Sequence, residues 1–269
     1  MFISDYDRAL HERIHEKMQD ERPEKLMENP RLAIFDYLKP VIGSLRGYGA
    51  DIGCGSAYAS IFLANNFPRI TQIDAIEQSE LAVSTLIPRN ISFWNTNSVN
   101  PVLGSFQSLE TNKYNFVIAL GALHHAPDLE ETAKSIYSSL LPGGLLIAQE
   151  PSMPDFTTHA QFEHKYSLTE SKLGVVGRNG DRLDRFFREC EYKAALVKAG
   201  FDLILWEDWF PKKANISKEK QLRQLVALAK QNGGIDEMTI ATLDVQPKVM
   251  VAQKSRCKKI FNLAVQMSS

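Results

Sequence analysis

The feature that most restricts the fold is a pair of apolar runs separated by one amphipathic segment between residues 116 and 150. Residues 116–120 are uninterrupted apolar side chains, a length and continuity typical of a strand buried on both faces. The next segment begins at Asp128, which can cap a helix with Glu131 three residues on, and it stops at Pro142. A second apolar run, 145–148, follows. Strand, helix and strand over this length predict two parallel strands.

The same alternation continues on both sides of this unit. Upstream, we predict a strand at 70–76, a short helix near 79–87 and a strand at 91–94. Downstream, a helix ends at Gly200, and strands follow at 201–206 and 249–252. Repeated strand and helix alternation predicts an α/β fold, a Rossmann-like doubly wound sheet of seven mostly parallel strands with helices on both faces.

Three regions fall outside this alternation. Residues 1–46 look helical, and we expect them to form an N-terminal cap on a single domain at 47–269. Two insertions, at about 151–188 and 211–244, interrupt that domain. We expect the two insertions to act as lids that determine which acceptor is used, because appended loops usually specialise a common scaffold.

Composition narrows the partners and the compartment. Lys and Arg total 31 against 32 Asp and Glu, so the net charge of −1 gives no field that would attract nucleic acid. No stretch approaches the roughly 18 apolar residues that cross a bilayer, and no signal peptide is apparent. The three cysteines lack a spacing that suits zinc or a redox pair. We therefore expect a cytoplasmic protein with no membrane contact, no nucleic-acid partner and no metal, and leave a homo-oligomer open.

The string from Asp51 to Ala57 contains the most informative turn. Gly53 and Gly55 would let the backbone turn sharply after a strand and approach a ligand at the start of a helix. A dinucleotide fingerprint would need a third glycine where Tyr58 stands, and a Walker phosphate loop would need a Lys-Ser or Lys-Thr pair. Dinucleotide binding is therefore the weaker interpretation, and the Walker phosphate loop does not match.

At this turn the sequence resembles the class I S-adenosylmethionine-dependent methyltransferases. Asp51, Gly53 and Gly55 match the family's first motif, with Cys54 between the glycines and Ala57 in place of the usual third glycine. The resemblance implies S-adenosylmethionine as cofactor and S-adenosylhomocysteine as product.

Further landmarks of the family follow in order, covering about residues 47–206. The family's ribose-binding acid is matched by Glu77, beside Gln78 and 22 residues after Gly55, with Asp74 as second choice. Asn97 and Ser98 match the place where the family contacts adenine. The fourth region begins near Asn115 and adds the remaining candidates for cofactor binding, Leu120 and Gly121.

Five side chains are candidates for catalysis, because histidine and carboxylate groups can remove a proton from a methyl acceptor. They are His124, His125, Glu150, His159 and His164. Each is equally open to a structural interpretation, such as a hydrogen-bonded histidine or a carboxylate that caps a loop. Positioning of the acceptor by itself can also suffice, because the sulfonium already makes the methyl group electrophilic.

The resemblance predicts a methyltransferase that acts on a small-molecule acceptor. Two alternatives remain at this level. One is an RNA or protein methyltransferase, which the near-neutral charge disfavours. The other is a regulatory protein that binds S-adenosylmethionine without catalysis.

Overall fold

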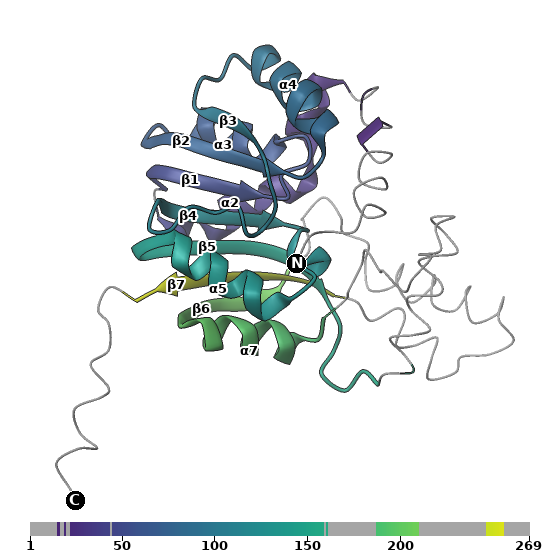
Figure 1. Cartoon of the computed structure of the whole chain (residues 1–269), viewed down its shortest axis with the longest axis vertical. Coiled ribbons are helices and arrows are strands. Elements are labelled where there is room, and N and C mark those ends of the chain that lie inside the picture. Colours follow the sequence, from purple (N-terminus) through teal and green to yellow (C-terminus); the bar gives the residue numbers. More distant parts are fainter. Residues whose placement is uncertain are drawn as a thin grey trace, which may run out of the picture.

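A seven-stranded sheet in the order β3-β2-β1-β4-β5-β7-β6 forms the centre of the computed structural model (Figure 1). The structure describes residues 15, 16, 19, 22–43, 45–158, 160, 187–209 and 246–255. Strands β1 to β5 pair in parallel, whereas β7 runs antiparallel to both β5 and β6. The strands are β1 (Gly47–Ile52), β2 (Ile70–Glu77), β3 (Val99–Leu103), β4 (Tyr114–Leu120), β5 (Leu140–Ser152), β6 (Phe201–Asp208) and β7 (Gln246–Lys254). The predicted seven-stranded, mostly parallel sheet is confirmed.

Helices cover both faces of the sheet (Figure 1). On one face, α2 (Ala33–Ile42) and α3 (Tyr58–Asn66) pack against Phe116 and Ile118 of β4. On the other face, α5 (Leu129–Ser139) and α7 (Glu189–Ala199) pack against Val117 and Ala119 of the same strand. Successive β4 residues thus enter different cores, which is why this strand is a continuous apolar run.

Local signals begin α5 and end α7 where the sequence predicts. The Asp128 Oδ1 atom accepts a hydrogen bond of 2.9 Å from the Glu131 amide and caps α5. Helix α7 ends at Gly200, whose φ of 105° is accessible mainly to glycine. Helix α5 ends at Ser139, earlier than the predicted stop at Pro142, which lies within β5.

The strand predicted at 91–94 is wrong. These residues end α4 (Ile87–Phe93), a helix preceded by the π-helical turn η3 (Ala82–Leu86), and the next strand is β3. The reason is the spacing of the apolar side chains: Ile87, Ile91 and Trp94 lie four and three residues apart and pack into one cluster, whereas Phe93 is 53% exposed. The alternation that a strand requires is absent.

Both predicted insertions attach at the carboxyl edge of the parallel strands. One leaves after β5 and returns at α7, and the other leaves after β6 and returns at β7, whose first residue, Gln246, pairs with Ser152. Most of the first insertion, including 161–186, and all of the second, within 210–245, lie outside the described residues. Among the helices that the structure describes, none has the length and apolar character to cross a bilayer.

Candidate active site

The glycine turn joins β1 to α3 at the carboxyl edge of the sheet. Gly53, Gly55 and Ala57 have φ values of 64°, 56° and 61°, so every second residue of the turn uses the left-handed region. A Cβ atom on Gly53 would lie 2.8 Å from the Cβ of Ala122, whereas a Cβ on Gly55 would meet nothing within 4 Å. Gly53 is therefore needed for close packing, and Gly55 faces open space.

Glu77 at the end of β2 is hydrogen-bonded directly to this turn. Its Oε2 atom accepts from the Gly55 amide at 2.9 Å, and its Oε1 atom accepts from the amides of Gln78 at 2.8 Å and Ser79 at 3.3 Å. The side chain is 5% exposed. A carboxylate has about four lone-pair sites, so three amide bonds leave acceptor capacity for a ligand hydroxyl.

Asp74, the second choice for that role, is hydrogen-bonded to four other side chains. Its carboxylate accepts hydrogen bonds from the Tyr48 hydroxyl, the Asn100 amide, the Lys113 ammonium and the Tyr114 hydroxyl at 2.9 to 3.0 Å. Burial acts to raise the pKa of Asp74, but the hydrogen bonds outweigh burial and lower it. Asp74 is thus the acceptor at the centre of a packed network between β1, β2, β3 and β4.

Asp51 and Cys54 are buried at the turn, and burial disfavours the charged form of both side chains. The Ser60 hydroxyl donates to Asp51 Oδ2 at 2.6 Å, and the carboxyl is 2% exposed. Burial raises the pKa of Asp51 to about 7, and the negative charge of Glu77 adds to this shift. Burial also raises the pKa of the Cys54 thiol well above its usual value.

A cavity of about 660 Å³ opens beside the turn. The structure brings five of the predicted cofactor residues to its wall: Gly53, Cys54, Gly55, Leu120 and Gly121. The opposite wall is the N-terminal segment with the short helices η1 (Pro23–Glu28) and η2 (Pro30–Leu32). The predicted cap therefore forms part of the site.

Two residues of this cavity, Arg31 and Tyr58, were not predicted as ligand-binding residues. The Arg31 Nη1 atom donates to the Leu120 carbonyl at 3.1 Å, and a Cβ on Gly121 would lie 2.8 Å from it. The Tyr58 hydroxyl is buried and has no hydrogen-bond partner in the part of the chain that is described. Burial raises the pKa of Tyr58, and the nearby Arg31 charge opposes that shift. No sequence signal marks either residue, since arginine and tyrosine are common in helical segments.

Asn97 and Ser98 do not reach this edge of the sheet. Both precede β3, so they lie at the amino end of a strand whose carboxyl end, followed by Gly104 and Ser105, points toward the cavity edge. Their assignment as adenine contacts followed from the wrong strand at 91–94 and is corrected here. Gly104 and Ser105 occupy the position at the end of β3 instead.

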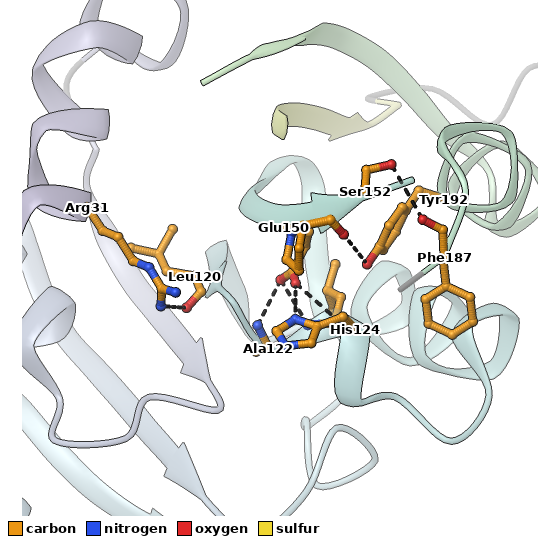
Figure 2. A network of polar contacts seen from close by, with 10 residues as sticks. Arg31, Leu120, Ala122, His124, Glu150, Ser152, Phe187 and Tyr192 are labelled. Atoms are coloured by element: carbon orange, nitrogen blue, oxygen red, sulfur yellow. Dashed lines mark hydrogen bonds and ion pairs between the residues drawn. The ribbon is translucent and has the colours of Figure 1, made fainter. Parts of the chain in front are cut away.

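Glu150 and His124, predicted separately, contact each other (Figure 2). The Oε1 atom of Glu150 accepts from the amides of Ala122 and Leu123 at 2.9 and 2.8 Å. Its Oε2 atom lies 3.3 Å from the His124 amide and 2.8 Å from His124 Nδ1. The four donors belong to the start of the short helix η4 (Leu123–His125), which follows Gly121.

The remaining histidines differ in how the structure places them. The His125 ring contacts the His124 ring with centroids 3.9 Å apart and ring planes tilted by 42°. His159 and His164 lie outside the described residues, so their catalytic roles stay predictions. Within the described residues, no group of three His, Cys, Asp or Glu side chains is arranged to hold a metal ion.

Comparison with known proteins identifies a matching family and several relatives. A family model described as a methyltransferase domain matches residues 10–233. A sterol 24-C-methyltransferase of Aspergillus fumigatus is 33% identical over 109 residues, which are 40% of this chain and 27% of that protein. A trans-aconitate 2-methyltransferase of Deinococcus radiodurans is 27% identical over 133 residues, 48% of each chain. The chain thus spans about a quarter to a half of the length of these relatives.

A solved structure shares the fold. The geranyl diphosphate C-methyltransferase of Streptomyces coelicolor, crystallised with Mg²⁺, geranyl diphosphate and S-adenosyl-L-homocysteine, has a TM-score of 0.59. The match covers 82% of this chain and 77% of that one at 10% identity, so it shows the fold alone.

Proposed function

Because this chain belongs to the class I S-adenosylmethionine-dependent methyltransferases, we propose that it transfers a methyl group from S-adenosylmethionine to a small-molecule acceptor. The observation that carries the proposal is the hydrogen bond between the Gly55 amide and Glu77 beside the cavity. This hydrogen bond links the glycine turn, whose backbone a ligand can approach closely, to Glu77, a buried acid at the end of β2. A nucleoside with an aliphatic extension needs that combination.

The residues around the cavity fit this cofactor. Glu77 would accept hydrogen bonds from the ribose hydroxyls, while Gly53 and Gly55 would lie against the methionine end. The Tyr58 hydroxyl lacks a partner in the described structure, and together with Arg31 it would donate to the methionine carboxylate. When bound, the cofactor supplies a methyl group that its sulfonium makes electrophilic.

Several observations support a small-molecule acceptor. The net charge of −1 gives no general attraction to nucleic acid. Both insertions attach at the carboxyl edge, where they can enclose an acceptor beside the cavity. Sterol, trans-aconitate and geranyl diphosphate appear in the names of similar proteins. These compounds are chemically diverse, so they support the size class of the acceptor more than its identity.

The same proposal includes the organisation and location of the protein. We place a cap at 1–46 and the catalytic domain at 47–269, in the cytoplasm and without a nucleic-acid partner. The described part of the cap packs on the sheet through Phe35 and Leu38. Self-association stays a prediction, which analytical ultracentrifugation tests.

Two measurements test the function. Titration calorimetry of the folded protein with S-adenosylmethionine should give saturable binding, and absence of binding at millimolar ligand contradicts the proposal. Incubation with methyl-labelled cofactor and the low-mass fraction of a cell extract should transfer label to a small molecule. Transfer only to the protein or RNA fraction would instead support a macromolecular acceptor.

A further inference from the structure

We propose that Arg22 and Lys25, on the N-terminal wall of the cavity, bind an anionic group of the methyl acceptor, a carboxylate or a phosphate. This inference rests on the proposed methyl transfer. It narrows the small-molecule acceptor to a compound that is negatively charged at neutral pH.

The N-terminal wall of the cavity carries a charged side chain at every third position. Helices η1 and η2 of this wall are 3-10 helices, in which side chains three residues apart lie one above the other. The charged residues of the wall follow that spacing, and all of them line the cavity: Arg22, Lys25, Glu28 and Arg31. One face of the segment therefore presents three positive charges and one negative charge to the cavity.

Contacts with the rest of the protein fix the orientation of this face. The indole Nε1 atom of Trp94, directly after α4, donates to the Pro23 carbonyl at 2.9 Å. Met27 packs against the cluster of buried residues that includes Cys54 of the glycine turn. Helix η1 is thus attached to both α4 and the turn, and its charged face is held beside the proposed cofactor site.

Two of the four charges match the amino-acid end of the cofactor. Arg31, which reaches the Leu120 carbonyl (Figure 2), would bind the methionine carboxylate as proposed above. Glu28 would accept hydrogen bonds from the methionine ammonium. The cofactor carries one of each charge at this end, so Arg31 and Glu28 together are sufficient for it.

Arg22 and Lys25 are left without a negative partner. Both side chains are exposed, and neither has an ion pair or a side-chain hydrogen bond with another described residue. Two buried acids near the site have other donors, because Glu77 accepts from three backbone amides and Glu150 from the amides before His124. The sulfonium of the cofactor adds a further positive charge. A carboxylate or phosphate on the acceptor would supply the missing negative charge, since Arg and Lys bind these groups well.

Fractionation of a cell extract tests the charge of the acceptor with wild-type protein. The low-mass fraction is separated on an anion-exchange column at neutral pH, and each part is incubated with methyl-labelled S-adenosylmethionine. Label should be transferred to the retained compounds. Acceptor activity among the unretained compounds would overturn the inference.

Phosphatase treatment of the retained compounds distinguishes the two anionic groups. Loss of acceptor activity after treatment would identify a phosphate, and survival of the activity would indicate a carboxylate. Either result supports an anionic acceptor.

The variants R22Q and K25Q separate the acceptor from the cofactor. The apparent KM for the retained compounds should rise about 5- to 10-fold in each variant, because a charge-assisted hydrogen bond is lost, while kcat changes little. Calorimetry should show S-adenosylhomocysteine binding within about twofold of wild type. The matched control R46Q removes an exposed arginine that lines a separate cavity with Asn115, and it should leave both quantities unchanged.

Two results with the variants overturn the inference. One is an unchanged apparent KM in both variants, with their fold checked by circular dichroism. The other is a loss of S-adenosylhomocysteine affinity as large as the rise in KM, which would assign Arg22 and Lys25 to the cofactor. Failure of the proposed function would look different, because wild-type protein would then not bind S-adenosylmethionine or would transfer label to no low-mass compound.

Discussion

Replacement of Glu77 by glutamine removes the charge that is expected to hold the cofactor ribose. The shape of the side chain is kept, but one oxygen becomes an NH2 group. That group must face either the Gly55 amide or the amides of Gln78 and Ser79, all of which are donors. The variant therefore weakens the turn and removes the charge-assisted bonds to the ribose together.

The size of the effect follows from these bonds. A hydrogen bond to a charged group contributes about 1.5–3 kcal/mol, against about 0.5–1.5 kcal/mol for a neutral one. Loss of the charge, with one donor left facing another, should weaken cofactor binding by about 1–3 kcal/mol. At about 1.4 kcal/mol per tenfold change, the dissociation constant rises about 5- to 150-fold.

Calorimetry with S-adenosylhomocysteine measures this change directly. The matched control is Asp74→Asn, an acid of the same strand whose four donors are all on protein side chains. The control should bind S-adenosylhomocysteine like the wild type, although its free energy of unfolding should fall. Equal affinities of Glu77→Gln and wild type, or a loss confined to Asp74→Asn, would refute the assignment of the ribose to Glu77.

Three further perturbations test other parts of the site. Tyr58→Phe removes a buried hydroxyl without a described partner, so urea unfolding of the ligand-free protein should show equal or higher stability. Calorimetry should show S-adenosylhomocysteine binding about 1 kcal/mol weaker. Unchanged affinity would remove Tyr58 from the site. Burial raises the pKa of Asp51 to about 7, whereas an Asp in the unfolded chain has a pKa of about 4. This group therefore makes the wild-type unfolding free energy fall as the pH rises from about 4 to about 7 and level off at higher pH. Asp51→Asn should therefore gain stability relative to wild type at pH 8 compared with pH 5, and an equal difference at both would contradict the burial of a protonated acid. Gly53→Ala combines a left-handed alanine with a Cβ contact of 2.8 Å to Ala122 and should lower the unfolding free energy by about 2–4 kcal/mol. Gly55→Ala has open space around its Cβ and should lower it by about 1–2 kcal/mol. The reverse order in urea denaturation would show that the turn is packed differently.

The sequence was most informative where one residue's role is set by its neighbours in the chain. The continuous run of β4, the Asp128 cap and the Gly200 stop each depend on residues within one element, so their patterns predict them. The helix at 87–93 was missed because Ile91 and Trp94 were read as part of a short apolar run. Their helical spacing becomes clear only when Ile87 is included.

The active-site contacts depend on pairings that no local pattern contains. Arg31 reaches the carbonyl of Leu120, 89 residues away, because the N-terminal segment crosses the carboxyl edge of the sheet. Glu150 meets His124 because β4 and β5 pair with Leu120 opposite Gln149, which brings Glu150 beside the residues that follow the end of β4. Both members of the second pair are candidates from sequence, but their contact depends on the register of the folded sheet.

A crystal structure of the protein with S-adenosylhomocysteine bound tests most directly whether the glycine turn and Glu77 form the cofactor site. We predict the ribose hydroxyls within hydrogen-bond distance of the Glu77 carboxylate, with the homocysteine part against Gly53 and Gly55 and its carboxylate near Arg31 and Tyr58. A ligand bound elsewhere on the sheet, or a ribose held by a different acid, would contradict the assignment.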